Sequence, residues 1–523
     1  MKKRLLSLKN YTLKEYYDSY QEIEMWMWDQ EKLLTPKNEH KKEITELCES
    51  LVLEMSEFPI WMRIHFLSFC MKCSEEVKYA EWLMNEVLDA DYDILGEYNK
   101  YYLFWQITRS TFENFKLQSI TMKKGLAKLY KNLYMAFYQA LQTDRFSYIP
   151  VEQRNKEKIF VFTSQFLSEN HGPTKTACDR ICYLQKHLGK KVLLINTAML
   201  VTQKGEMPFY KRNRAGYEPK YLQMIQYNFR NEKFGFFQCE NNMPDSETIW
   251  ALLEMVWKEK PYCIINIGGG DICADLCGTI VPEITVNTVP SEIAVTTGRF
   301  QITERDLEAT DYELLQILGA KPENIEKSLF TYVFKEQIYH YTRKEMGLSE
   351  NSRVLLITGW RLDYEMQGDF LQMLEKLFVE NNFLEAVFMG RFEQYEQMLA
   401  SYPKLQEKSH YFADQEDALA VMELCDIYVN PKRKGGGTSA AEALYKGLPV
   451  VTIPFGDVAE AAGEIFWVDD YQGMGDKIKR YCEDKSYYEK MSKRARERAE
   501  ALTDSKTHFG EAFLKIEKSQ DFQ

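Results

Sequence analysis

The length, composition and charge of the chain exclude several classes of protein. It has 523 residues, of which 45% are hydrophobic, and a formal net charge of -12 at pH 7. This length exceeds that of one compact domain and predicts about three. An acidic chain without a long run of lysine or arginine lacks the footprint of nucleic-acid binding, so we expect no nucleic-acid partner.

The cysteine and histidine spacing gives no sign of a metal site. Close cysteine pairs such as Cys70 with Cys73 and Cys273 with Cys277 have no second pair or histidine at zinc spacing. We therefore expect no metal ion and no bound cofactor. The N-terminus has basic residues but no apolar signal core, and no run of about 18 apolar residues occurs anywhere. The sequence predicts a cytoplasmic protein with reduced thiols and no transmembrane segment.

Residues 1–150 have the composition of an all-helical domain. They hold only two of the 26 glycines, Gly96 and Gly125. Apolar residues recur three and four positions apart among charged ones, which places them on one helix face. One such predicted stripe consists of Ala80, Trp82, Leu83, Val87 and Leu88.

After Pro150 the pattern changes to short apolar runs separated by amphipathic segments. This alternation predicts strands and helices in turn, and therefore a parallel sheet. The runs fall into two groups, which predict two Rossmann-like lobes at 155–340 and 341–500, followed by a helical tail at 501–523. The predicted strands are 159–163, 191–195, 262–267 and 283–286 in the first lobe, and 354–359, 384–390, 426–430 and 449–453 in the second.

The most informative segment is a glycine-rich turn after the strand that begins at Asp426. Three glycines would let the backbone approach a ligand closely, and two hydroxyls would cap a helix that we expect to begin near Ala440. The amides and dipole of that helix favour a pyrophosphate, and Lys432, Arg433 and Lys434 add positive charge beside it. The alternative is a flexible turn capped by Thr438. The predicted anion-binding residues are Gly435, Gly436, Gly437, Thr438 and Ser439.

Glu442 follows this turn within one helical turn of Ser439. A carboxylate in this position can accept hydrogen bonds from ribose hydroxyls, as acidic residues do in other nucleotide sites. The alternative is an ordinary carboxylate on the helix surface. The segment is neither a P-loop, because the glycine-lysine-serine order is missing, nor the fingerprint of dinucleotide folds.

The succession Gly-Gly-Thr-Ser, Ala-Ala-Glu-Ala-Leu and Lys-Gly-Leu-Pro-Val-Val-Thr over 436–452 resembles the donor-binding region of GT-B glycosyltransferases. It is similar to family four and to the O-GlcNAc transferase and HMW1C-like protein glycosyltransferases. The resemblance covers both lobes as a fold pattern, but only 430–458 as a specific motif. It implies a GT-B fold of α/β class, with two Rossmann-like lobes of parallel sheets behind the all-helical domain.

The resemblance also implies the ligands. The second lobe would hold a nucleotide sugar, with UDP as the expected carrier, and the turn would grip its diphosphate. The helical domain would bind a protein acceptor, a partner subunit or a second copy of the chain. Retaining family-four enzymes place a further glutamate eight positions before the one that matches Glu442, where this chain has Lys434. This difference favours the inverting relatives.

Two arginines follow strands of the second lobe. Arg361 resembles the basic residue that neutralises the diphosphate of the leaving group in related transferases. Its alternative is a surface arginine that pairs with Asp363. Arg391 lies at the end of the next strand and is a candidate for contact with the nucleotide base, or for no contact at all.

The candidate catalytic groups lie in the first lobe. His171 follows the strand 159–163, and a neutral imidazole there could remove a proton from an acceptor hydroxyl or amide. Its alternative is a helix cap or surface group. Asp271 is the second choice for the base. The neighbouring Gly172, Gly269 and Gly270 would let the backbone lie close to donor or acceptor.

The sequence therefore predicts a metal-independent glycosyltransferase that moves a sugar from a nucleotide-sugar donor to a protein or saccharide. Two alternatives stay open. The first is a non-catalytic GT-B protein that binds an acceptor or partner subunit, because a missing family glutamate is what a degenerate site would show. The second is a sugar-nucleotide epimerase on the same fold. The sequence leaves open the sugar, the acceptor, the stereochemistry and the oligomeric state.

Overall fold

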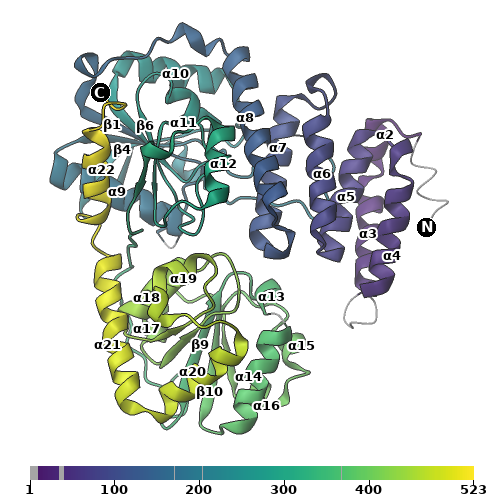
Figure 1. Cartoon of the computed structure of the whole chain (residues 1–523), viewed down its shortest axis with the longest axis vertical. Coiled ribbons are helices and arrows are strands. Elements are labelled where there is room, and N and C mark those ends of the chain that lie inside the picture. The colour runs from purple at the N-terminus through teal and green to yellow at the C-terminus, as the bar shows by residue number, and fades with distance from the viewer. Residues whose placement is uncertain (1–9, 35–40, 170, 203, 206, 367) are drawn as a thin grey trace.

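The computed structural model describes residues 10–34, 41–169, 171–202, 204–205, 207–366 and 368–523. It has three parts: a row of helices, a first α/β lobe beside them, and a second α/β lobe that lies below the first in Figure 1. The chain ends in a helix that returns from the second lobe to the first, at the left of the same view.

The helical region precedes the first strand. In α6 (Val77–Asp89) the buried face consists of Tyr79, Ala80, Leu83, Met84 and Val87. The predicted stripe was wrong at Trp82, which is 41% exposed, because its position turns it to the side of the helix, edge-on to Tyr79. The other α-helices described in this region are α2 (Leu13–Asp18), α3 (Tyr20–Leu34), α4 (Lys41–Leu53), α5 (Ile60–Ser74), α7 (Tyr92–Glu113) and α8 (Ile120–Ala140).

The helical region and the first lobe share one hydrophobic core. Phe104 of α7 and Tyr130 of α8 belong to the same buried cluster as Phe160 and Ile264 of the sheet. Hydrogen bonds cross the same boundary, since the Tyr130 hydroxyl donates to Asp275 Oδ2 at 2.9 Å. Buried apolar area of this kind dominates the free energy of folding, so α7 and α8 are part of the first lobe energetically.

The first lobe is built on an eight-stranded sheet of order β3-β4-β2-β1-β5-β6-β7-β8, parallel except for the antiparallel pair β3 and β4 at one edge. β5 is buried along its whole length, as expected of a central strand covered on both faces. The strands are β1 (Asn155–Thr163), β2 (Lys191–Asn196), β3 (Gln226–Phe229), β4 (Glu232–Gln238), β5 (Pro261–Ile267), β6 (Glu283–Val286), β7 (Phe300–Thr303) and β8 (Ile325–Lys327). The helices are α9 (Gly172–Leu188), α10 (Ser246–Glu259), α11 (Ile272–Cys277) and α12 (Ala309–Leu318).

The second lobe has a five-stranded parallel sheet of order β11-β10-β9-β12-β13. Its strands are β9 (Arg353–Gly359), β10 (Leu384–Gly390), β11 (Ser409–Phe412), β12 (Ile427–Val429) and β13 (Val450–Val451). Its helices are α13 (Leu362–Glu365), α14 (Gly368–Glu380), α15 (Tyr395–Leu399), α16 (Pro403–Glu407), α17 (Ala418–Met422), α18 (Gly437–Tyr445), α19 (Gly456–Ala462), α20 (Tyr471–Glu483) and α21 (Lys485–Leu502). The α/β class with parallel sheets and helices in front is therefore confirmed.

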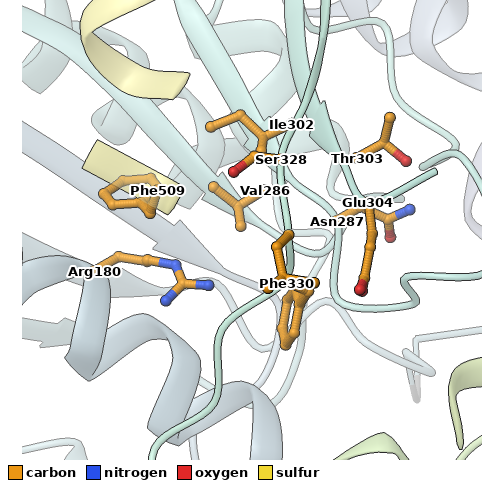
Figure 2. A pocket seen from close by; sticks show the side chains of 10 residues that line it. Arg180, Val286, Asn287, Ile302, Thr303, Glu304, Ser328, Phe330 and Phe509 are labelled. Atoms are coloured by element: carbon orange, nitrogen blue, oxygen red, sulfur yellow. The ribbon is translucent and has the colours of Figure 1, made fainter. Parts of the chain in front are cut away.

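The chain crosses between the lobes twice, once in the linker before β9 and once between α21 and α22 (His508–Glu517). Arg180 of α9 ties both crossings together, since its guanidinium donates to Thr331 Oγ1 at 2.6 Å and to Ser505 Oγ at 3.2 Å. Figure 2 shows this guanidinium between Phe330 of the linker and Phe509 of α22, beside a small pocket. Phe509 packs into the core of the first lobe and holds α22 there.

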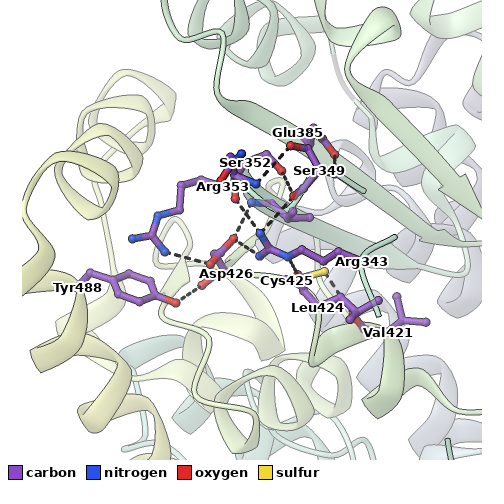
Figure 3. A network of polar contacts seen from close by, with 12 residues as sticks. Arg343, Ser349, Ser352, Arg353, Glu385, Val421, Leu424, Cys425, Asp426 and Tyr488 are labelled. Atoms are coloured by element: carbon purple, nitrogen blue, oxygen red, sulfur yellow. Dashed lines mark hydrogen bonds and ion pairs between the residues drawn. The ribbon is translucent and has the colours of Figure 1, made fainter. Parts of the chain in front are cut away.

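A charged network fixes the start of β12 in the second lobe (Figure 3). The Asp426 carboxylate accepts from Arg343 at 2.7 Å, from Arg353 at 3.0 Å and from the Val354 amide at 2.8 Å. The Tyr488 hydroxyl donates to the Asp426 carbonyl oxygen at 3.2 Å. The side chain of Asp426 is only 13% exposed, so the network links β9, β12 and α21 with little help from water.

We expect Asp426→Ala to lower the free energy of unfolding by about 3 kcal/mol, because it leaves two arginines without their carboxylate. Urea unfolding of the variant and the wild type measures this loss. Glu393→Ala is the matched control, since Glu393 is 66% exposed and pairs only at the surface. The control should stay within about 0.5 kcal/mol of wild type. Equal unfolding curves for the two variants would contradict the assignment.

Candidate functional site

A cavity of about 930 Å³ lies between the two lobes. Loops at the carboxyl ends of strands from both sheets line it, which is where ligands bind in open α/β folds. α7 and α8 of the helical region form a third wall. The cavity is large enough for a ligand of the size of a nucleotide sugar.

The glycine-rich turn lines this cavity, but its helix starts earlier than the sequence predicted. α18 begins at Gly437, and Gly436 is the N-cap with a φ of 105°. Residues with a side chain rarely adopt that backbone conformation, so a glycine rather than Thr438 is the N-cap. Thr438 and Ser439 instead occupy the first turn, where backbone amides lack partners within the helix. An anion at the start of α18 would meet those amides and the positive end of the helix dipole.

Two predicted cations lie beside the turn. Arg361 lines the cavity and pairs with Glu365 at 3.0 Å, so the predicted alternative of a pair with Asp363 was wrong. Its guanidinium also lies over the ring of Phe112, 5.2 Å from the centroid. Lys434 lines the cavity as well, and its ammonium contacts Glu292 of the first lobe at 2.7 Å.

Glu292 joins three parts of the molecule. Burial raises the pKa of its carboxyl, but the ammonium groups of Lys434 and Lys123 outweigh burial and hold that pKa below its ordinary value. Lys123 belongs to α8 and lies 3.1 Å away. Next to it, Ser291 donates to the Asp457 carboxylate of the second lobe at 2.9 Å, and burial raises the pKa of Asp457 to about 7.

Arg433 was predicted to add positive charge beside the turn, but its guanidinium is used for bonds inside the second lobe. Its guanidinium is 4% exposed and donates to Glu365 at 2.7 Å, to the Thr358 carbonyl at 2.7 Å and to Asn430 at 2.7 Å. These bonds join the carboxyl ends of β9 and β12. The Glu365 carboxylate in turn holds Arg361, so the buried Arg433 orients the cation that lines the cavity.

Glu442 also lines the cavity, but it is not free. Its Oε1 atom lies 3.2 Å from Nζ of Lys175, which comes from α9 of the first lobe. The two side chains are 13% and 8% exposed. The predicted alternative of a surface carboxylate is therefore wrong, and Lys175 is a cavity residue that no sequence pattern singled out.

His171 lines the cavity directly before α9. Its Nδ1 atom lies 2.9 Å from Thr174 Oγ1, which fixes the ring. Burial, with help from the charges of Arg109 and Lys175, lowers the pKa of His171 to about 4. The imidazole is therefore neutral at physiological pH. Gly172 follows, and a Cβ there would lie 3.3 Å from Thr438 Oγ1 of the opposite lobe.

The structure does not support two of the predicted residues. Asp271 is fully buried outside the cavity lining, where it caps α11 through the Ala274 amide and accepts from Thr197 at 2.5 Å. Its carboxylate is used inside the fold, although burial raises its pKa to about 6. Arg391 lies outside the cavity lining as well, 61% exposed and paired with Glu393, because its loop turns toward solvent.

The glycines before Asp271 line the cavity as predicted. The absence of side chains at these positions is explained by close packing against neighbouring elements, α7 among them. A Cβ at Gly270 would lie 3.0 Å from the ring of Trp105, and the Tyr101 hydroxyl donates to the Gly270 carbonyl at 2.7 Å. Both aromatic residues belong to α7. A side chain on Gly269 would lie 3.1 Å from Ala294. Close packing against α7 and the next loop therefore accounts for these small residues.

The third wall of the cavity could not be read from the sequence. Phe112 of α7 contacts Gly435 closely enough that a Cβ there would lie 3.6 Å from its ring. Phe115, which follows α7, packs its ring against Phe455 of the second lobe with centroids 5.3 Å apart. The helical region therefore touches the turn that we assign to anion binding. Among the described residues, no group of three or more His, Cys, Asp and Glu side chains gathers as metal ligands.

The chain matches one family model and is similar to several solved structures. Residues 342–498 match the family model described as glycosyl transferases group 1. The O-GlcNAc transferase mutant of Thermobaculum terrenum has a similar structure, with a TM-score of 0.51, 11% identity and 86% of each chain covered. A glycosyltransferase from Rickettsia africae gives a TM-score of 0.49 and 13% identity over 70% of this chain and 100% of that chain. Anabaena HepE in complex with UDP gives 0.45 and 12% identity, again over 70% and 100%.

The fold and the family match define the class: the chain is a glycosyltransferase enzyme with a GT-B fold. Its second lobe, over residues 342–498, is a glycosyl transferases group 1 domain, as the resemblance implied. No curated protein matches the chain in sequence. In the part of the chain that the structure describes, every helix is too short or too polar to cross a membrane.

Proposed function

We propose that the enzyme transfers a sugar from a UDP-linked donor to a hydroxyl or amide of a protein or saccharide, without a metal ion, in the cytoplasm. One observation carries the proposal. A glycine-capped helix start, a cation at Arg361 and a carboxylate at Glu442 line one cavity together with a neutral imidazole from the opposite lobe. The helical region would receive a protein acceptor, a partner subunit or a second copy of the chain.

The expected position of the donor follows from the charged and polar groups that line the cavity. The diphosphate would lie at the start of α18, where the amides of Gly437 and its neighbours and the helix dipole favour an anion. Arg361 would stabilise the charge that develops on the leaving diphosphate, which is the task that a metal ion performs in other transferases. The carboxylate of Glu442 would accept hydrogen bonds from the ribose.

The base would be His171. Its Nδ1 would carry the hydrogen that faces Thr174, which leaves the Nε2 lone pair for the acceptor. As the acceptor oxygen or nitrogen forms its bond to the anomeric carbon, its proton passes to Nε2. The bond from that carbon to the phosphate oxygen breaks, and its electron pair leaves with the nucleoside diphosphate. This inverting displacement needs no further reactant.

A binding panel tests the proposal. We expect one nucleotide sugar and its nucleoside diphosphate to raise the thermal midpoint of the wild type, because a ligand that binds only the folded state stabilises it. Glu442→Ala and Gly436→Val should each abolish that shift. A Cβ at Gly436 would lie 2.9 Å from Arg433 Nη2 and 3.0 Å from Val458, so the larger side chain would displace the turn.

A matched control is Gly473→Val, since Gly473 lies in α20 and outside the cavity lining. It should keep the ligand-induced shift. If no nucleoside diphosphate or nucleotide sugar shifts the wild type, the proposal fails, and the chain is better described as a GT-B protein that binds an acceptor or partner without catalysis.

A further inference from the structure

The first turns of α9 and α18, one from each lobe, lie against each other. At their starts, Gly172 is packed against Thr438, as described above. One turn further along both helices, the ammonium of Lys175 contacts the carboxylate of Glu442 at 3.2 Å. The positive ends of two helix dipoles and one lysine thus surround the place where a diphosphate would lie.

The Lys175–Glu442 pair is nearly shielded from water, since its side chains are 8% and 13% exposed. A buried ammonium needs an anionic partner, because desolvation of an unpaired charge is costly. A nucleotide whose ribose hydroxyls bind Glu442 would compete with Lys175 for the same carboxylate oxygens. The bound nucleotide would itself supply a second anion, the diphosphate, within the same cavity.

We propose that Lys175 leaves Glu442 when the donor binds and pairs with its diphosphate, where it stabilises the charge on the leaving group. This inference rests on the proposed function and adds a catalytic residue from the first lobe. When the bond between the anomeric carbon and the phosphate oxygen breaks, the electron pair stays on that oxygen. The ammonium donates a hydrogen bond to the oxygen and keeps its proton.

Two other cations that line the cavity, Lys434 and Arg361, have partners other than Glu442. Lys434 is held by Glu292 of the first lobe, which is not a residue that we assign to the donor. Arg361 is anchored by Glu365, which the buried Arg433 also holds. Lys175 is thus a cation whose partner is the residue that we assign to the ribose. Donor binding would exchange one ion pair between the lobes for another.

The test compares a nucleoside diphosphate with its nucleoside, using UDP and uridine as probes in calorimetric titrations. In Lys175→Met we expect UDP to bind at least tenfold more weakly, whereas uridine binds equally well or better because Glu442 has lost its competitor. Lys175→Arg should keep most of the UDP affinity. The matched control is Lys186→Met on the same helix, whose lysine pairs with Glu232 at the surface. It should change neither affinity.

The outcomes separate this inference from the proposed function. If the wild type binds neither UDP nor any other nucleoside diphosphate of the panel, the proposed function fails, and this inference with it. If the wild type binds UDP and Lys175→Met binds it equally well, only the role of Lys175 is overturned. A loss of UDP and uridine affinity by the same factor would also overturn it, because a merely structural pair would affect both ligands alike.

Discussion

His171→Ala should lower kcat by a factor of about 10² to 10⁴, the usual contribution of a positioned general base. Donor binding should change little, because the imidazole lies on the first lobe, opposite the predicted diphosphate and ribose residues of the second. Release of nucleoside diphosphate in the presence of acceptor measures the rate, and a titration with UDP measures the binding. His187→Ala is the matched control, since His187 lies at the exposed end of the same helix.

The pH dependence gives the same assignment a second test. The imidazole must be neutral to accept a proton, and its pKa is about 4 in the ligand-free enzyme. The rate constant kcat/KM, which reports the free enzyme, should therefore stay level as the pH falls from 7 toward 5 and decline only near pH 4. A decline centred near pH 6.5, or a His171→Ala variant with wild-type kcat, would contradict the role of His171.

Arg433→Gln should lower the free energy of unfolding by about 3 to 5 kcal/mol, because it leaves the buried carboxylate of Glu365 without its main partner. The wild-type guanidinium also holds the ends of β9 and β12 together through Thr358 and Asn430. Chemical denaturation measures the loss. Donor binding should be lost as well, since Glu365 orients Arg361.

Arg361→Gln is the comparison that separates stability from ligand binding. The side chain of Arg361 is 20% exposed and lines the cavity, so its loss should weaken binding of a nucleoside diphosphate with a much smaller effect on unfolding. If Arg433→Gln unfolds like the wild type, or if Arg361→Gln is the less stable of the two, the division between a structural and a ligand-binding arginine is wrong.

The sequence was sufficient for the class and for finding the glycine-rich turn that lines the cavity, because both depend on local patterns. Short apolar runs such as 262–267 and 384–390 are typical of buried parallel strands, and both occur as predicted. The edge pair β3 and β4 escaped prediction, because its exposed alternate residues weaken the apolar signal. The turn at 435–439 was recognisable because consecutive glycines indicate a backbone conformation or a close approach that residues with side chains would not allow.

The rest of the site depends on contacts between distant segments, which no local pattern reveals. Lys175 is one helix lysine among many until the fold places it against Glu442, 267 positions away. Phe112 belongs to the helical region, and only the fold places it against Gly435. Asp271 is the reverse case, a residue that was predicted to be catalytic but lies buried outside the cavity lining. A polar residue directly after a strand is a reasonable catalytic candidate. Asp271 instead caps α11 by accepting a hydrogen bond from the Ala274 amide, and the glycines before it drew attention to ligand binding rather than to this cap.

The two crossings between the lobes, pinned by Arg180, limit how the enzyme can open. A body joined to another at two neighbouring points can only rotate about the line through them, so the α22 side of the cavity is the axis. We expect the largest displacement far from this axis, where Phe115 of the helical region packs against Phe455 of the second lobe. Donor and product would then pass along the helical region, and its contact with the second lobe would set how fast they exchange.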